Sequence, residues 1–489
     1  MSTSDPGYTR GLTRREFTAL LPLGLVACSV RDEKGINKNL TIADARLATR
    51  DSSNYESWRQ SMPWQDWTAD RYPAVIVRPN NRNAAIEAVR FAARNNFRIA
   101  IKSGGHNLSE AFLRNDSLLL DLGELQDLEI NSAEKTAWVE PALWSHLLIR
   151  QLAPYDLAFP VAHCATVPMG GYLLGGGLGI NGDEWNTIAC HSILAAEVVL
   201  ADGSVITVSP DEHADIYWAV RGAGTGFFGV VLRYKLQLYD LPAHIYESRY
   251  IFPIESIDAA DALLSSLAES GIRKTELMML IAHNPMASPG SGAPPHVCVA
   301  RIVTFADSIE EANAILAAPA AHPAASSAVF SQTHIPTTFT EMGESSVNWS
   351  QGLGFGRSMV DTVWTDETEK LLPTLVQPFA LSNSPHNHVI VSYKINPVLR
   401  EDSAFSVIGK AFVGAYAIWE RPAEDSKNFE WVRSMGRVMR QLAKGSYINE
   451  INAFENPDIQ ENCFDEASWQ RLQLLRKNHD PRGLFHGFV

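Results

Sequence analysis

Residues 164–179 read CATVPMGGYLLGGGLG, and six of the last ten of these positions are glycine. Because glycine has no Cβ, such a run lets the backbone come close to a flat or phosphorylated ligand. Backbone N–H groups in loops of this kind also form anion-binding sites. The stretch therefore predicts a planar or phosphorylated ligand bound directly against the main chain.

The end of this run, residues 177–182, satisfies the dinucleotide pattern GxGxxG. A nicotinamide-dinucleotide fingerprint follows a strand and opens a helix. Here the pattern follows further glycines, and residues 183–186, DEWN, do not begin a clear helix. The sequence therefore argues against a nicotinamide-binding Rossmann domain.

Strands and helices alternate around the glycine run. The spacing of apolar residues predicts a helix over 83–95. Short apolar strands are expected before and after it, and Asp202-Gly203 predicts the turn of a hairpin. The strands expected in this region cover 74–77, 98–101, 117–122, 195–200, 204–208 and 228–238.

The remainder of the chain mixes the two kinds of element. Helices are expected over 257–268 and 308–317, strands over 297–304, 388–393 and 411–419, and a surface loop over 285–295. The chain has 489 residues, whereas a single core stops growing at ~250–300 residues, so two intertwined domains are expected. Residues 445–489 are too short to fold alone.

The charge balance argues against nucleic acid as a partner. The cysteine pattern gives no indication of a metal site. The 41 Lys and Arg residues against 55 Asp and Glu give a formal net charge of −14, whereas nucleic-acid binding needs a concentrated basic surface. The five cysteines form no CxxC pair, so neither zinc nor a redox pair is indicated.

Residues 1–30 have the features of an export signal. Arg14 and Arg15 precede an apolar stretch over 17–30, which is too short for a membrane span of ~20 residues. The pair resembles a twin-arginine signal and indicates a periplasmic or cell-envelope protein. Residues 25–28, LVAC, resemble a lipobox, which makes Cys28 a candidate for a lipid anchor. The alternative is a helical N-terminal extension of a cytoplasmic protein.

Four motifs, in order and spacing, resemble one family. Residues 102–107 read KSGGHN, 164–171 read CATVPMGG, 217–230 read YWAVRGAGTGFFGV, and 447–450 read YINE, followed by Asp480-Pro481 and Phe485. Together they resemble the FAD-binding domain of the vanillyl-alcohol-oxidase (PCMH-type FAD-binding) superfamily, in its berberine-bridge-enzyme-like branch. The resemblance runs over 68–240 and from 445 to the end, and the middle matches only loosely.

The resemblance implies an α+β fold. A two-subdomain PCMH-type FAD-binding domain is expected over 68–241, and a substrate-binding domain over 242–440 with an antiparallel sheet covered by helices. Residues 1–40 are then the export signal with an N-terminal extension, and 441–489 are a C-terminal segment that returns to the FAD domain.

The resemblance also implies FAD attached at two points, through the 8α carbon to His106 and through C6 to Cys164. Without the motifs, His106 is interpreted as a loop histidine at a strand end, and Cys164 as a small buried apolar residue. Covalent attachment prevents loss of the cofactor where no free FAD is present, which fits export.

Further residues are expected around the cofactor by their positions. Expected at the pyrophosphate are Ser103, Gly104, Gly105, Asn107 and Ser109. Expected beside the ribityl chain and the flavin ring are Thr166, Val167, Gly170, Gly171, Gly175, Gly176 and Gly177, with Val199 at the adenine and Asn449 reaching the flavin from the C-terminal segment.

This sequence differs from the common residues of the branch at positions that determine the substrate chemistry. Phe412 stands at the position of the glutamate base of berberine-bridge enzymes, so that base cannot be transferred. Tyr172 stands where plant members often have histidine, and Pro168, Phe227 and Cys190-His191 also differ from the common residues.

In such an enzyme the substrate gives a hydride to flavin N5 while a base takes its proton. Candidate catalytic proton acceptors are Glu450, Tyr447, Tyr416 and Tyr393. The alternative role of each tyrosine is packing on a neighbour in a sheet, and that of Glu450 is a surface cap in the terminal segment. Residues expected to wall the substrate pocket are Trp349, Phe355, Arg357, Trp364, His386 and His388.

Three functions remain open. The first is an oxidase that oxidises an alcohol, an amine or a phenolic, ring-bearing small molecule, with O₂ reduced to H₂O₂. The second is a dehydrogenase with a quinone or protein acceptor. The third is a non-catalytic exported binding protein on a flavoprotein scaffold. Val167 favours the oxidase, because a valine at this position of the branch resembles a gate that admits oxygen.

Overall fold

The computed structural model describes residues 28–31, 37–185, 188–288, 290–344 and 356–488. For β1 (Cys28–Arg31) and β2 (Asn37–Leu40) it describes an antiparallel backbone pair. The Arg14-Arg15 pair and two expected pocket residues, Trp349 and Phe355, lie outside the described residues.

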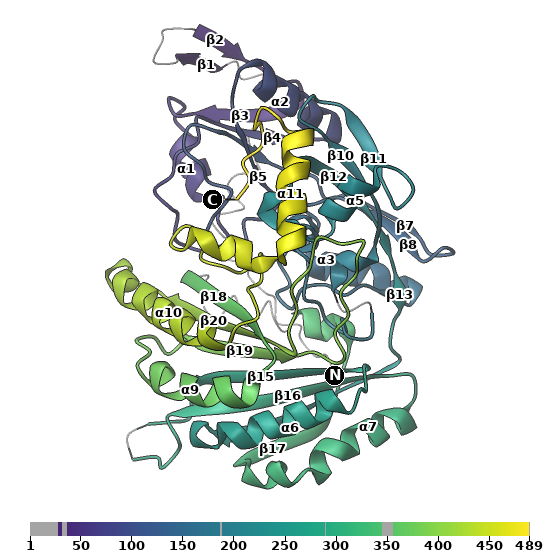
Figure 1. Ribbon diagram of the computed structural model, residues 1–489, viewed down its shortest axis with the longest axis vertical. Helices are drawn as coiled ribbons and strands as arrows, with labels where there is room; N and C mark the ends of the chain where they lie inside the picture. The colour runs from purple at the N-terminus through teal and green to yellow at the C-terminus, as the bar shows by residue number, and fades with distance from the viewer. Residues whose placement is uncertain (1–27, 32–36, 186–187, 289, 345–355, 489) are drawn as a thin grey trace, which may run out of the picture.

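The largest layer is an antiparallel sheet of seven strands in the order β17-β14-β16-β15-β19-β20-β18. The strands are β14 (His244–Pro253), β15 (Thr275–His283), β16 (His296–Ala306), β17 (Phe330–Thr337), β18 (Arg357–Thr365), β19 (His388–Tyr393) and β20 (Ala411–Trp419). In Figure 1 this sheet forms the lower half of the molecule, and α6 (Ile257–Glu269), α7 (Ile309–Ala321) and α9 (Thr368–Ala380) lie on its lower side. A fourth helix, α10 (Asp425–Met439), packs on β18 and β20.

The alternation of side chains along each strand gives this sheet two different faces. On β19, Val389, Val391 and Tyr393 lie in the core beneath the helices. The alternate residues His388 and Ile390 face the other way and line a cavity. The sheet therefore presents one face to its helices and the other to a candidate site.

The N-terminal half of the molecule, residues 45–240, contains two smaller sheets. The first has the order β3-β4-β6-β5, with β3 (Ala45–Thr49) antiparallel to β4 (Val75–Pro79), and with β6 (Leu118–Asp121) and β5 (Ile99–Lys102) parallel to it. The helix α2 (Arg82–Arg94) connects β4 to β5, and Asn81 caps it by accepting a hydrogen bond from Ala84 N. Its apolar face, which includes Ala85, Ala88 and Val89, packs on the sheet.

The second sheet is antiparallel, in the order β11-β10-β12-β8-β7. Its strands are β7 (Leu128–Asn131), β8 (Thr136–Val139), β10 (Ile193–Val199), β11 (Val205–Val208) and β12 (Val230–Gln237). The predicted hairpin is confirmed as β10 and β11, and its turn has Gly203 at φ +82°, a conformation that glycine adopts without strain. These layers confirm the expected α+β class.

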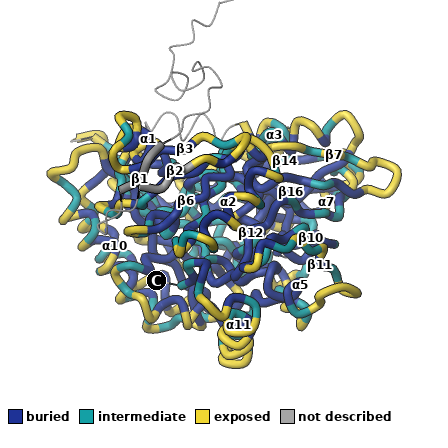
Figure 2. The backbone as a smooth tube through the Cα atoms, turned by 90° about the horizontal axis from the view of Figure 1, so that it is seen from above, coloured by how far each residue is buried: buried dark blue, intermediate teal, exposed yellow. Residues whose placement is uncertain are grey.

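The C-terminal segment packs against the N-terminal half. Its helix α11 (Glu466–His479) lies beside α5 (Ala214–Val220), and Figure 1 shows it in yellow across the upper half. After α11, Ile99 N donates to Leu484 O at 2.7 Å and His486 N donates to Ile99 O at 2.8 Å. The end of the chain thus extends the edge of the sheet at β5. In Figure 2, α11 protrudes with exposed turns, whereas the strands are mostly buried.

No helix among the described residues combines the length and the apolar character that a membrane span requires.

Candidate active site

A cavity of about 890 Å³ lies between the N-terminal half and the open face of the seven-stranded sheet. Segments 100–108 and 162–174 contribute most of one wall, and side chains of β14, β15, β16, β19 and β20 form the other. Residues of 447–450 and 486–487, from the C-terminal segment, complete the lining. The cavity therefore exists only where three distant parts of the chain meet.

The two residues expected to bond to FAD lie around one hydroxyl group. The Oγ1 atom of Thr166 is 3.0 Å from His106 Nε2 and 3.6 Å from Cys164 Sγ. Trp64 Nε1 donates to the same oxygen at 3.1 Å, and the Trp64 ring stacks on His106 with 4.7 Å between centroids. Burial raises the pKa of the Cys164 thiol. Both His106 and Cys164 line the cavity.

Glycines bring the loops of this wall close together. A Cβ on Gly105, where φ is +79°, would lie 2.0 Å from Met62 O, and one on Gly170 would lie 2.9 Å from Ser103 Oγ. At Gly171 no atom lies within 4 Å of the Cβ position, although the residue lines the cavity. With Gly104, these residues form a wall with bare backbone on its surface, which fits a flat and elongated group such as FAD.

Other expected cofactor residues divide into those that line the cavity and those that support it. Ser103, Asn107 and Val167 are part of the lining. Asn107 Oδ1 accepts a hydrogen bond from Ser109 Oγ at 2.9 Å, so Ser109 holds the loop from behind. Thr166 and Val199 are not part of the lining either. Val199 instead packs in the hydrophobic core around α2 and the four-stranded sheet.

The three later glycines of the run contact protein groups rather than the cavity. A Cβ on Gly175 would lie 2.0 Å from Asn449 Oδ1, and one on Gly176 would lie 2.7 Å from the Phe405 ring. Gly177, at φ +90°, donates its N–H to Tyr447 Oη at 3.0 Å. These glycines are not among the lining residues, and Gly175 makes room for Asn449 of the C-terminal segment.

That segment brings three candidate residues to the cavity, Tyr447, Asn449 and Glu450. Asn449 Nδ2 donates to Tyr172 O at 3.2 Å and to Tyr447 Oη at 3.0 Å. Asn449 and Tyr447 both line the cavity. Burial raises the pKa of Tyr447 well above that of a free phenol, so its hydroxyl keeps its proton at neutral pH.

Two of the remaining acid–base candidates, Tyr416 and Glu450, form a hydrogen-bonded pair. Tyr416 Oη donates to Glu450 Oε2 at 2.5 Å, and both residues line the cavity. Burial raises the pKa of Glu450, and burial together with Glu450 raises the pKa of Tyr416. The His388 ring stacks on Tyr416 at 5.1 Å, and burial lowers the pKa of His388 to about 4. The carboxyl of Glu450 is therefore the titrating group of this cluster.

Tyr393 is not brought to this cluster. It points to the helix side of the sheet, where its hydroxyl donates to Asp261 at 2.6 Å. Arg357 likewise pairs with Asp425 at 2.5 Å and is not part of the lining. Of the expected pocket residues within the described chain, His388 lines the cavity, and Trp364 is buried behind it against Phe412.

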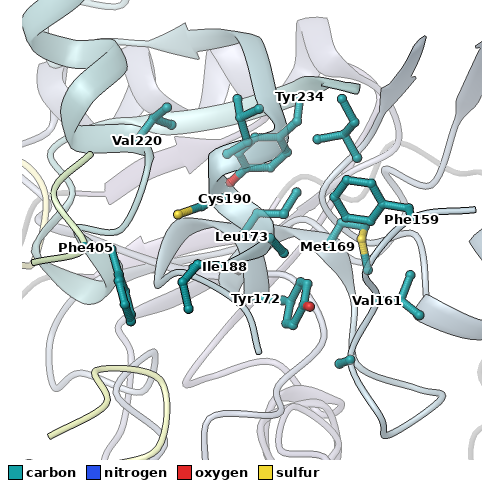
Figure 3. Close-up of a cluster of buried hydrophobic side chains, with 14 of the residues drawn as sticks. Phe159, Val161, Met169, Tyr172, Leu173, Ile188, Cys190, Val220, Tyr234 and Phe405 are labelled. Carbon is teal, nitrogen blue, oxygen red and sulfur yellow. The ribbon is translucent and has the colours of Figure 1, made fainter. Parts of the chain in front are cut away.

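Of the departures from the family pattern, Cys190 and His191 lie outside the lining, whereas Pro168, Tyr172, Phe227 and Phe412 line the cavity. Burial raises the pKa of Cys190 to about 12, and Figure 3 shows its side chain in the same apolar cluster as Tyr172, Leu173 and Ile188. The Tyr172 hydroxyl donates to Pro160 O at 2.6 Å. The side chain of Phe412 lines the cavity at the expected base position, and it has no proton acceptor.

A charged group that the sequence analysis missed lies on the open face of the sheet. Glu247, Arg249, Arg301 and Lys394 line the cavity, and Glu276 lies among them. His163 Nε2 is 3.0 Å from Glu276 Oε2, which connects the segment before Cys164 to this sheet. None of these residues belongs to a local motif, so only the alternation along the strands points to them.

Comparison with known proteins agrees with this geometry. A family model described as an FAD binding domain matches residues 73–209. An FAD-linked oxidoreductase of Penicillium janthinellum is 28% identical over 465 residues, which cover 92% of this chain and 99% of the relative.

Two solved structures share the fold over nearly the whole chain. The 6-hydroxy-D-nicotine oxidase of Arthrobacter nicotinovorans superposes with a TM-score of 0.78 at 19% identity, covering 91% of this chain and 97% of that one. The berberine-bridge-like enzyme 1 of Physcomitrella patens gives a TM-score of 0.75 at 18% identity, covering 90% and 95%. These two likenesses confirm the fold that the four motifs imply, and the family model confirms the FAD binding domain over residues 73–209.

Proposed function

This chain is an FAD-dependent oxidoreductase with the berberine-bridge-like fold, and we propose that it is an oxidase with FAD bonded covalently to His106 and Cys164. It oxidises an alcohol, an amine or a phenolic, ring-bearing small molecule, and O₂ takes up the electrons to give H₂O₂. The observation that carries the proposal is the meeting of His106 and Cys164 around the Thr166 hydroxyl, in the wall of the cavity.

The surroundings of these two side chains support attachment. Thr166 and Trp64 hold the His106 ring in one orientation, through a hydrogen bond and a stacking contact. Cys164 is a half-buried thiol beside the same hydroxyl and belongs to no disulfide. In the family resemblance, the 8α carbon bonds to His106 and C6 bonds to Cys164.

When bound in this cavity, FAD would supply the hydride acceptor for the oxidation. The protein's own contribution is to orient the substrate over the sheet and to take its proton. Glu450 is the group for that task, because burial raises its pKa towards the range in which a general base is most effective. Tyr416 fixes the orientation of the carboxylate through their hydrogen bond.

The choice between oxygen and another acceptor rests on Val167. Its side chain lines the cavity three residues after Cys164. Oxygen needs a small apolar space near the flavin, and one additional methylene fills such a space in a packed wall. A dehydrogenase with a quinone acceptor is the competing function, and the release of peroxide distinguishes the two.

The experiment on attachment uses the purified protein after denaturation. The wild type is expected to keep its yellow colour and the mass of FAD after acid precipitation. Cys164→Ala and His106→Ala are each expected to retain one bond, and the double variant is expected to release all flavin. Release of all flavin from the acid-precipitated wild type would overturn the proposal of covalent attachment.

We also propose export by the twin-arginine route to the periplasm or cell envelope, on the strength of Arg14-Arg15 and the short apolar stretch that follows. A lipid on Cys28 would anchor the exported protein to a membrane. Covalent flavin supports this destination, because a lost cofactor is not replaced there.

A further inference from the structure

The charged residues on the open face of the sheet form a row, which consists of Glu247, Arg249, Arg301, Glu276 and Lys394. They come from four neighbouring strands, since Arg249 is opposite Arg301 and Met278 is opposite both Arg301 and Ser392. Lys394 directly follows β19, and its N–H donates to Lys410 O at 2.8 Å. The backbone therefore holds Lys394 at the end of the same face.

Within the row, the carboxylates are already paired. Glu247 lies 3.2 Å from Arg301 and also pairs with Arg249. Glu276 lies 3.3 Å from Arg301 and 3.0 Å from His163. Burial alone would raise the pKa of Glu276, but His163, Arg301 and Lys394 lower it to about 2, so this carboxylate stays charged.

Lys394 is the cation for which no partner remains. The residue is 8% exposed and lines the cavity. Among the described residues, its ammonium makes no hydrogen bond and no ion pair within 4.0 Å. Its charge acts on Glu276 and Asp183 without a direct ion pair, because Glu276 pairs with Arg301 and His163, and burial raises the pKa of Asp183 and weakens it as a counter-ion. A buried charge without a partner is costly, so an ammonium group in a cavity wall indicates an external anion.

The position of the row connects this lysine to the reacting part of the cavity. His163 contacts Glu276 and directly precedes Cys164, so the cofactor wall lies next to the row. The rest of the sheet face is largely apolar, with Met278, Leu280 and Ile390 in the lining. Among the described residues of this face, Lys394 is thus the cation that no carboxylate pairs, and it lies at the end of an apolar surface.

We propose that Lys394 binds an anionic group of the substrate, either a carboxylate or an ionised acidic hydroxyl, while the apolar body of the substrate lies over the sheet towards Glu450. This assignment narrows the substrate class of the proposed oxidase and rests on that function for its catalytic meaning. Binding of the anion itself requires only the flavin-loaded protein.

The test compares aromatic acids with their neutral amides. Benzoate, phenylacetate and indole-3-acetate are titrated against the flavin-loaded protein, beside benzamide, phenylacetamide and indole-3-acetamide, by flavin absorbance and by calorimetry. At least one acid is expected to bind about 10-fold or more tightly than its amide, since a hydrogen bond to a charged group contributes that much. Equal affinity of every acid and its amide, or no binding of any acid, overturns the proposal.

The variants assign the preference to one side chain. Lys394→Met is expected to weaken binding of the acid about 10- to 100-fold and to leave the amide unchanged. Lys410→Met is the matched control, because this exposed lysine directly precedes β20, accepts the backbone hydrogen bond of Lys394 N and is not part of the lining. Unchanged affinity of Lys394→Met for the acid overturns the assignment.

Thermal unfolding separates a ligand-binding lysine from a structural one. Removing an unpaired buried charge is expected to leave the midpoint of unfolding unchanged or to raise it. A midpoint lowered by several degrees in Lys394→Met shows a structural ion pair and contradicts the proposal. The assay for peroxide release is independent of these measurements. If the acid binds but no peroxide is released, the anion site at Lys394 is supported and the oxidase function is contradicted. If peroxide is released but no acid binds, the oxidase function is supported and the anion site is contradicted.

Discussion

At the scale of single residues, the hydrogen bond between Tyr416 and Glu450 sets the proton chemistry of the cavity. The carboxyl is buried, which raises its pKa, while Tyr416 lowers that pKa by donating to it. A base must be ionised to accept a proton, so activity should increase as the pH rises through this elevated pKa and should then level off.

Replacing the carboxylate tests this role. Glu450→Gln is expected to slow flavin reduction by substrate about 10²- to 10⁴-fold and to abolish the increase with pH. Tyr416→Phe keeps the carboxylate but removes the hydrogen bond that lowers its pKa, so the increase should move to higher pH. The measurement is the rate of anaerobic flavin bleaching between pH 4 and 10, and an unchanged pH profile in Glu450→Gln would contradict the assignment.

We propose that Val167 controls access of oxygen to the flavin in the proposed oxidase. Its carbonyl accepts hydrogen bonds from Ser145 N at 2.9 Å and Ser145 Oγ at 2.8 Å, so its backbone is fixed and an added methylene must enter the cavity. Val167→Leu is expected to slow reoxidation of the reduced flavin by orders of magnitude while flavin reduction changes little. Stopped-flow mixing with oxygenated buffer measures this step. Wild-type reoxidation slower than turnover with a quinone would indicate a dehydrogenase instead.

The location of single residues in the cavity was predictable only where a local sequence motif contains them. His106 and Cys164 are identified by the glycines beside them, and the structure places both in the cavity lining. Lys394 and Glu276 have no such local signal, because the residues that surround them come from strands and loops that are distant in sequence. Tyr393 was a candidate proton acceptor, but it lies on the helix side of the sheet. Successive side chains of a strand point to opposite faces, so a shift of one residue along β19 decides whether a side chain reaches the cavity.

At the scale of elements, close approach between the glycine run and the C-terminal segment builds the cavity. Gly175 has no Cβ, and the Asn449 amide occupies that space while it donates to Tyr172 and Tyr447. Gly175→Ala is therefore expected to cost about 1–3 kcal/mol in the free energy of unfolding, since Asn449 must give up these bonds.

A double-mutant cycle checks that the cost arises from this contact. In an Asn449→Ala background the space is open, so adding Gly175→Ala should cost close to nothing. Urea unfolding of the four proteins gives the coupling energy. Equal costs of Gly175→Ala in both backgrounds would show that the strain lies elsewhere.

Elements with regular local patterns were predictable, and those that depend on tertiary contacts were not. The helix α2 and the β10–β11 hairpin carry a cap and an Asp-Gly turn. By contrast, α9 contains Pro373 and Pro378 within its span, and β14 has charged residues at cavity-facing positions, so neither has the usual pattern of its class. Packing on the seven-stranded sheet determines both.

At the scale of the whole molecule, the cavity is completed by the last part of the chain. Tyr447, Asn449 and Glu450 line it, and the segment around Phe485 joins the edge of the first sheet at Ile99. FAD can therefore meet its complete site only after the entire chain has been synthesised and folded. This order of events requires an export route that carries folded proteins, if the cofactor is bound before export.

The Arg14-Arg15 pair, which we propose as a twin-arginine signal, is the sequence feature that would meet this requirement, and its replacement provides the last prediction. Arg14→Lys combined with Arg15→Lys is expected to hold a full-length, flavin-loaded precursor in the cytoplasm, because the paired guanidinium groups are the signal that the route reads. Cell fractionation with immunoblotting measures the distribution, and Cys28→Ala is the matched control, since it removes lipidation without affecting the arginines. A double-lysine variant that reaches the envelope at the wild-type level would show that the signal has been misassigned. Incorporation of a labelled fatty acid that disappears in Cys28→Ala would establish the anchor separately from the route.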